Sequence, residues 1–250
     1  MKEDDCMKFG IDLGHGVGQD RGAEGVIAEE TIINAVGSLV ISKLKALGHS
    51  VVELRPTIAN SINDSLQQRY NKADYYNVDL CVSIHANAGG GKGTEVFTYK
   101  AKEVPQARAV LNNLVSLGFA NRGIKDGSSL AMVKRPSATA MLIEICFVDN
   151  QSDASLYNSI GVEKIANAIV SGLTGQTVSI DNKKYYVVTD YLPKDKDGYL
   201  DINYVLSYFK DVKCYFKSDS KGIWIETQYL SKSKCEELKE TLGSWFYAIR

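Results

Sequence analysis

Residues 8–173 alternate between short apolar runs typical of strands and longer segments with helical periodicity, and this alternation restricts the chain to few folds. The expected elements follow one another in this order: strand 8–14, helix 29–47, strand 50–55, helix 60–77, strands 79–85 and 93–99, helix 105–118, strand 139–148 and helix 161–173. Runs such as LCVSI and AMLIEI are almost entirely apolar, as expected of strands that are buried on both faces. The pattern predicts an α/β fold, in which a twisted, mostly parallel sheet carries helices on both faces.

The composition of the chain changes near residue 175. The first 175 residues contain 18 of the 21 glycines, whereas the last 75 contain 14 of the 23 phenylalanines, tryptophans and tyrosines. Because such a change is typical of a domain boundary, we expect a first domain over residues 1–175, a linker over 176–183 and a second domain over 184–250. The second domain is expected to be a small α+β domain of order βαββαβ, in which two helices cover one face of a four-stranded sheet.

The charge and apolar patterns exclude several classes of protein. Twenty-nine basic and thirty acidic residues leave a net charge of -1, so the chain lacks the strong field that holds nucleic acid. No apolar run approaches the roughly 18 residues of a membrane-spanning helix, and the acidic start MKEDDC lacks the pattern of a secretory signal peptide. The five cysteines contain no CxxC pair, which argues against a disulfide framework or a thiolate zinc site. We therefore expect no nucleic-acid partner, no membrane insertion and a protein that is kept inside the cell.

Polar side chains at the ends of apolar strands mark the candidate site, because sites in α/β sheets form beyond the carboxyl ends of the strands. His15 follows the first expected strand, His85 ends the third and Glu144 interrupts the apolar run of the last. Glu29 begins the first helix above the same edge. Two imidazoles and a carboxylate suit one Zn²⁺ ion with an open position for water, and Glu144 is a candidate general base. Each histidine taken alone fits a structural role as well, and His49 is expected at the surface.

At these residues the chain resembles the zinc-dependent N-acetylmuramoyl-L-alanine amidases. The resemblance covers residues 8–173 and consists of ordered motifs: IDLGHGVGQDRGAEG, two glutamates before a helix, LQQRYNKAD, SIHANA, GTEVF, NRGIK and LIEICFVDN. It implies that His15, Glu29 and His85 bind the zinc ion. It also implies that Glu144 is the catalytic acid and base. Glu30 is the alternative to Glu29, because both lie where the family has one glutamate, and the spacing to the end of the helix favours Glu29.

The resemblance implies a peptidoglycan hydrolase that uses zinc-activated water to cleave the amide bond between N-acetylmuramic acid and L-alanine, which lyses the bacterial cell wall. Asn87, beside His85, is a candidate substrate contact and equally fits a turn. The second domain resembles the sporulation-related repeat domain, which binds peptidoglycan glycan strands, and Trp224 and Tyr229 are its candidate sugar contacts. Such an enzyme is expected to stay in the cytoplasm until lysis releases it to the wall, either as a phage endolysin or as a sporulation autolysin.

Two other classes of function stay open at this point. A zinc peptidase of the wall would have the same metal site but would cut a peptide bond, and only its product would distinguish it. A non-catalytic wall-binding protein would have lost its active site. Glu144 argues against this second class, because an ionisable group in a strand buried on both faces is costly unless it is paired or functional.

Overall fold

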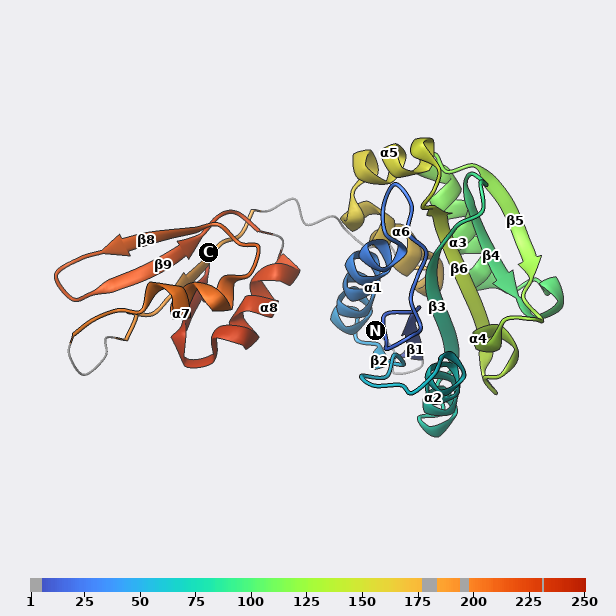
Figure 1. Cartoon of the computed structure of the whole chain (residues 1–250), viewed down its shortest axis with the longest axis horizontal. Helices are drawn as coiled ribbons and strands as arrows, with labels where there is room; N and C mark the ends of the chain where they lie inside the picture. Colours follow the sequence, from blue (N-terminus) through green and yellow to red (C-terminus); the bar gives the residue numbers. More distant parts are fainter. Residues whose placement is uncertain (1–5, 177–183, 194–197, 231) are drawn as a thin grey trace. The chain divides into compact units, whose positions relative to one another are not determined.

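The computed structural model describes residues 6–176, 184–193, 198–230 and 232–250, without the side chain of residue 233 (Figure 1). The chain divides into two compact units, Met1–Ile180 and Asp181–Arg250. All but the first residue of the expected linker, 176–183, lies outside the described residues. None of the described helices is long and apolar enough to cross a membrane.

The first unit contains a six-stranded mixed sheet of order β2-β1-β3-β6-β4-β5. Its strands are β1 (Lys8–Leu13), β2 (Ser50–Glu53), β3 (Leu80–Asn87), β4 (Thr94–Thr98), β5 (Asn121–Asp126) and β6 (Thr139–Phe147). Neighbouring strands are parallel except for β4, which pairs antiparallel with β6. The mostly parallel sheet is therefore confirmed. Because β4 and β5 run the other way, their amino ends lie at the same edge as the carboxyl ends of β1, β3 and β6.

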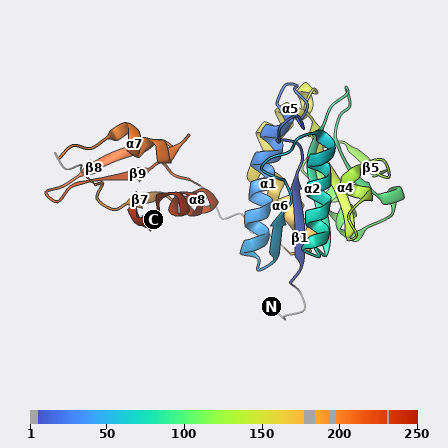
Figure 2. The same ribbon diagram turned by 60° about the horizontal axis from the view of Figure 1, so that its bottom comes forward.

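Helices cover both faces of this sheet, as predicted. The helices of the first unit are α1 (Glu29–Ala46), α2 (Ile62–Tyr75), η2 (Tyr99–Ala101), α3 (Pro105–Ser116), α4 (Ala131–Lys134), α5 (Gln151–Ile160) and α6 (Val162–Thr174). Apolar residues of α1, α3 and α6 share one core with the sheet, and those of α2 and α4 pack in a smaller cluster on the other face. Figure 2 shows α1 and α6 on one side of β1 and α2 on the other. Burial on both faces explains why strands such as β3 are almost continuously apolar.

Three elements of the first unit and the environment of one histidine differ from the expectation. The strand β5 has the polar sequence NRGIKD and lies at the edge of the sheet, so it lacks the apolar alternation of a strand. The helix α4 has only four residues, too few to show a helical period, and α5 has few buried apolar residues and begins with a side-chain cap from Asn150. The expected surface position of His49 is wrong, because its ring is 7% exposed, packs edge-on against Phe9 and accepts a hydrogen bond from the Met7 N–H.

The second unit has the predicted order βαββαβ. Its elements are β7 (Val187–Thr189), α7 (Ile202–Leu206), η3 (Ser207–Phe209), β8 (Cys214–Ser218), β9 (Ile223–Thr227), α8 (Lys232–Leu242), η4 (Gly243–Trp245) and β10 (Phe246–Ile249). The four strands form an antiparallel sheet of order β10-β7-β9-β8. Both helices contribute to a core with one face of the sheet, where Val187 and Ile225 are fully buried. The small α+β class of the second domain is therefore confirmed.

Candidate metal and catalytic site

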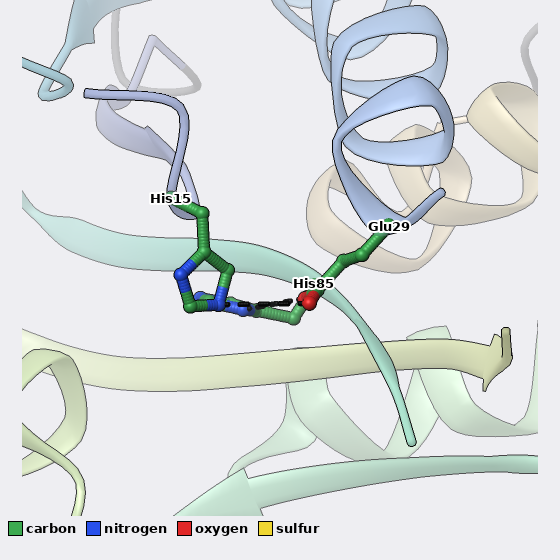
Figure 3. A group of neighbouring side chains, drawn as sticks. All are labelled: His15, Glu29 and His85. Carbon is green, nitrogen blue, oxygen red and sulfur yellow. Dashed lines mark hydrogen bonds and ion pairs between the residues drawn. The ribbon is translucent and has the colours of Figure 1, made fainter. Parts of the chain in front are cut away.

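The structure brings together His15, Glu29 and His85 from three separate elements (Figure 3). His15 follows β1, His85 lies near the end of β3, and Glu29 is the first residue of α1. One ligand atom from each side chain lies within 4.8 Å of the other two. Glu29 Oε1 is 3.1 Å from His85 Nδ1, and Glu29 Oε2 is 3.6 Å from His15 Nε2. These separations suit three side chains that converge on one metal ion.

Glu29, rather than Glu30, faces the two histidines. Its side chain is buried, and the backbone N–H groups of Ala23 and Ala86 donate hydrogen bonds to its two carboxylate oxygens. Glu30 instead accepts a hydrogen bond from a backbone N–H and forms a 2.9 Å ion pair with Arg21. Of the two glutamates, Glu29 is therefore the one whose side chain lies beside His15 and His85, because of the direction in which α1 begins.

Gly14 provides the space that His85 occupies. A Cβ atom added at Gly14 would lie 2.2 Å from His85 Cε1 and 2.4 Å from Nε2, closer than any real contact. The next residue, His15, has a left-handed backbone with φ 55°, which turns the chain away from the strand direction. The glycine and the turn together place the two imidazole rings edge to face, with their centroids 4.9 Å apart.

A buried ion network supports the backbone around His15. Arg69 of α2 is 1% exposed and donates to Asp12 Oδ1 at 2.6 Å and to the carbonyl oxygen of His15 at 2.8 Å. It also lies 3.3 Å from Asp20, whose other carboxylate oxygen is 2.8 Å from His15 Nδ1. Burial opposes ionisation of Asp20, but hydrogen bonds with His15 and Ser65 outweigh it and lower the pKa of this carboxyl to about 2. A carboxylate on the second ring nitrogen fixes the orientation of a metal-binding histidine.

A second arginine, Arg55, binds backbone carbonyl groups of the same turn. Arg55 Nε donates to the carbonyl oxygen of Leu13 at 2.7 Å, and its Nη2 donates to that of Gly14 at 2.8 Å. The sequence analysis missed Arg55, Arg69 and Asp20 as supports of the site. Their roles depend on carbonyl oxygens and distances in space, and the only sequence signal was their place inside or beside the quoted motifs.

Glu144 lies beside the histidine and glutamate group in the sheet. In the strand register it pairs with His85 of β3 on one side and with Glu95 of β4 on the other, so the three side chains share one face. Burial, followed by the negative charges of Glu29 and Glu95, raises the pKa of the Glu144 carboxyl well above its ordinary value. Its Oε2 atom is buried and has no hydrogen-bond partner in the described part of the chain. Such a group is costly to the fold, which is typical of functional carboxylates.

Glu95 and Arg122 were missed by the sequence analysis. Asn87 Nδ2 donates to Glu95 Oε1 at 2.8 Å, and Arg122 Nε donates to Glu95 Oε2 at 2.9 Å. The candidate Asn87 therefore contacts a buried carboxylate that lies next to Glu144. Glu95 and Arg122 lie near the amino ends of β4 and β5, whereas the sites of parallel sheets are expected at the carboxyl ends of their strands.

The two aromatic candidates lie in the second unit. Trp224 of β9 is half-buried, packs edge to face against Tyr191 and donates from Nε1 to Glu226 at 3.3 Å. Tyr229 follows β9 and is 64% exposed. Trp224 and Glu226 line a hollow of about 250 Å³. Tyr229 and Glu226 line a second hollow of about 410 Å³. Both aromatic residues therefore border recesses on the second sheet, which suits side chains that bind a ligand.

The match to a family model agrees with this arrangement. The model described as N-acetylmuramoyl-L-alanine amidase matches residues 10–175, which contain all the residues of the site in the first unit. The chain belongs to this family. Its first unit is an amidase domain, and the fold of known amidase catalytic domains is the mixed sheet with helices on both faces described above.

Individual relatives show how far the similarity extends. An uncharacterized protein of Clostridium perfringens is 29% identical over 181 residues, and the chain spans about half of its length, 53%. The sporulation-specific N-acetylmuramoyl-L-alanine amidase of Bacillus subtilis is 30% identical over 172 residues, which cover 67% of each chain. Among solved structures, the catalytic domain of an endolysin targeting Clostridia difficile has a TM-score of 0.62 and 27% identity, with 69% of this chain and 99% of that one covered. The similarity therefore concerns the amidase domain.

Proposed function

We propose that this protein is a peptidoglycan hydrolase that cleaves the amide bond between N-acetylmuramic acid and the L-alanine of the stem peptide. One observation carries the proposal: His15, Glu29 and His85 converge in an amidase-family domain, directly beside the buried carboxyl of Glu144. Hydrolysis of this bond by a protein that reaches the wall would lyse the bacterial cell.

Zn²⁺ is the metal that we assign to His15, Glu29 and His85. Two imidazole nitrogens and one carboxylate form a typical catalytic zinc set, and closed structural sites usually have a fourth protein ligand. One ligand atom from each of the three side chains lies within 4.8 Å of the other two, so His15, Glu29 and His85 together would hold the ion. When bound, a zinc ion lowers the pKa of a water molecule to about 7 and polarises the amide carbonyl group.

Glu144 is the residue that we assign to proton transfer. Its Oε2 has no partner among the described residues, so it is available to accept a proton from the attacking water. The same carboxyl then donates the proton to the nitrogen of L-alanine as the amide bond breaks. Asn87 is assigned to the substrate, because Glu95 uses one hydrogen of its Nδ2 and leaves the other for a peptide carbonyl.

The test is the product released from purified peptidoglycan with and without a chelator. We expect new amino-terminal L-alanine that disappears with the chelator and in Glu144→Gln, which keeps the shape of the side chain. Glu144→Gln should still bind zinc, whereas His85→Ala should not. A different amino terminus would identify a zinc peptidase of the wall, and the absence of any product would identify a non-catalytic wall-binding protein.

The second unit is assigned to binding of the peptidoglycan glycan. Trp224 and Glu226 alternate with the buried Ile225, so they lie on the face of the sheet away from the shared core. Aromatic rings on an open sheet face bind the flat faces of sugars, and a wall-binding unit raises the effective concentration of the enzyme on its polymer.

Co-sedimentation with purified wall sacculi tests this second assignment. Trp224→Ala and Tyr229→Ala should each lower the bound fraction severalfold without changing hydrolysis of short soluble fragments. Tyr204→Ala is the matched control, since this exposed tyrosine belongs to α7, one of the two helices that supply the shared core. Unchanged sedimentation of the two sheet variants would contradict the assignment.

A further inference from the structure

Arg122 is held in an unusual place at the edge of the first sheet. The register between β4 and β5 shifts here, so that one residue of β4, Glu95, lies opposite two residues of β5, Arg122 and Gly123. Gly123 has φ 86°, a conformation that favours glycine, and a Cβ there would meet nothing within 4 Å. Such an irregularity changes the direction of the neighbouring side chains and is common beside active sites.

The guanidinium group of Arg122 is fixed on one side and open on the other. Its Nε donates to Glu95 Oε2 at 2.9 Å, and its central carbon lies 4.7 Å from the centroid of the Phe147 ring. The side chain is still 36% exposed, and neither Nη group has a hydrogen-bond partner in the described ranges of the chain. Two parallel N–H donors therefore face solvent in a fixed orientation.

The position of this group relates it to the proposed chemistry. Glu95 pairs in register with Glu144, and β6, β4 and β5 are adjacent, so the backbones of Glu144 and Arg122 are about 10 Å apart. The Arg122 side chain spans part of this distance, because it reaches back to Glu95. Each residue of a bound peptide extends about 3.5 Å, so a group one or two residues beyond the cleaved bond lies within reach of the guanidinium.

We propose that Arg122 is a specificity-determining residue that binds a carboxylate of the stem peptide close to the cleaved bond. This inference rests on the proposed amidase function. A planar pair of N–H donors matches the two oxygens of a carboxylate, and the Phe147 ring keeps the guanidinium in place at little entropic cost. Glu95 accepts from Arg122 through Nε alone in the described residues, so both Nη groups are left for a ligand.

The experiment compares two substrates that differ in one group. Peptidoglycan fragments carry either D-glutamate, with a free carboxylate, or D-isoglutamine, its carboxamide, directly after L-alanine, and kcat/KM is measured for release of amino-terminal L-alanine. The wild type is expected to prefer the carboxylate substrate by about tenfold, the range of a charged hydrogen bond. In Arg122→Gln this ratio should fall to about one, with most of the change in KM. Arg108→Gln, which breaks an exposed pair between Arg108 of α3 and Glu103 just before that helix, should keep the wild-type ratio.

Two further variants keep the result interpretable. Glu95→Gln combined with Arg122→Gln removes the buried charge and its partner together, so the fold survives if the single variant is unstable, and it should also show a ratio of about one. The affinity of zinc-loaded Glu144→Gln for the two fragments measures the same preference without turnover.

The outcomes separate this inference from the proposed function. The role of Arg122 would be overturned if the wild type had the same kcat/KM on both substrates. It would also be overturned if Arg122→Gln kept the wild-type ratio, or lowered kcat/KM by the same factor on both substrates. Absence of amino-terminal L-alanine from both substrates would overturn the amidase function, and the binding comparison would still decide whether Arg122 recognises the carboxylate.

Discussion

The position of one side chain in the site depends on the absence of another. The His85 ring lies where a Cβ of residue 14 would be, so His85 reaches Glu29 only because residue 14 is glycine. Glu144 is the second unusual residue of the site, because its Oε2 atom is buried without a hydrogen-bond partner in the described part of the fold. Both features lie at the same edge of the sheet.

Gly14→Ala tests the close approach of His85. The added methyl group must displace the imidazole ring, because the contacts of 2.2 to 2.7 Å with its atoms leave no room. We expect zinc affinity to fall by about 10–100-fold, the range seen when the support of a metal ligand is disturbed. Competition with a chromophoric chelator measures the affinity.

Gly10→Ala, in the strand β1 that ends just before Gly14, is the matched control. A Cβ there meets methyl groups of Val78 and Leu54 at 3.1 to 3.2 Å, which are side chains that can adjust. This variant should lose some stability and keep the zinc affinity. If Gly14→Ala kept the wild-type affinity too, the role given to Gly14 would be wrong.

At the scale of elements, α2 is joined to the sheet by charge as well as by apolar packing. Arg69 of α2 lies between Asp12 of β1 and Asp20 of the following loop, and all three side chains are almost completely buried. Because the same guanidinium binds the carbonyl oxygens of Leu13 and His15, the position of the helix sets the position of a proposed metal ligand.

Arg69→Met is expected to destabilise the fold by about 3–5 kcal/mol, because it leaves two buried carboxylates without their counter-charge. Chemical denaturation of the two proteins gives the difference in unfolding free energy. Arg108→Met removes an arginine from an exposed ion pair and should leave the unfolding midpoint unchanged. A loss no larger than that of the control would show that the network contributes little to stability.

At the scale of the whole molecule, each unit has a hydrophobic core of its own. The core residues of the first unit come from residues 9–173, and those of the second come from residues 187–242. We therefore expect residues 1–180 and 181–250 to fold separately when each is produced alone. Calorimetry should give one cooperative transition for each fragment, and an unfolded fragment would contradict independent folding.

Removal of the metal should affect the first fragment alone. A ligand present at about 100 times its Kd stabilises the native state by about 2.7 kcal/mol, which corresponds to a Tm change of about 5–10 °C for a domain of this size. A chelator is therefore expected to lower the Tm of the first fragment and to leave that of the second unchanged. An equal shift in both fragments would show that the chelator acts on something other than the group of His15, Glu29 and His85.

The fold class was predictable because strands that are buried on both faces have almost continuously apolar sequences. The apolar runs of β3 and β6 and the helical spacing of α1 identify a covered, mostly parallel sheet. The strand β5 and the helix α5 have no clear apolar pattern in the sequence, because an edge strand and a helix with few buried residues need little apolar periodicity.

The sequence by itself determined the residues that form the centre of the candidate site. His15, His85 and Glu144 could be found because parallel strands bring their carboxyl ends to one edge. Only the tertiary structure decided between Glu29 and Glu30 and revealed Glu95 and Arg122. These choices depend on the angle at which a helix begins and on the reversal of β4 against β6, which arise from packing between segments far apart in the chain.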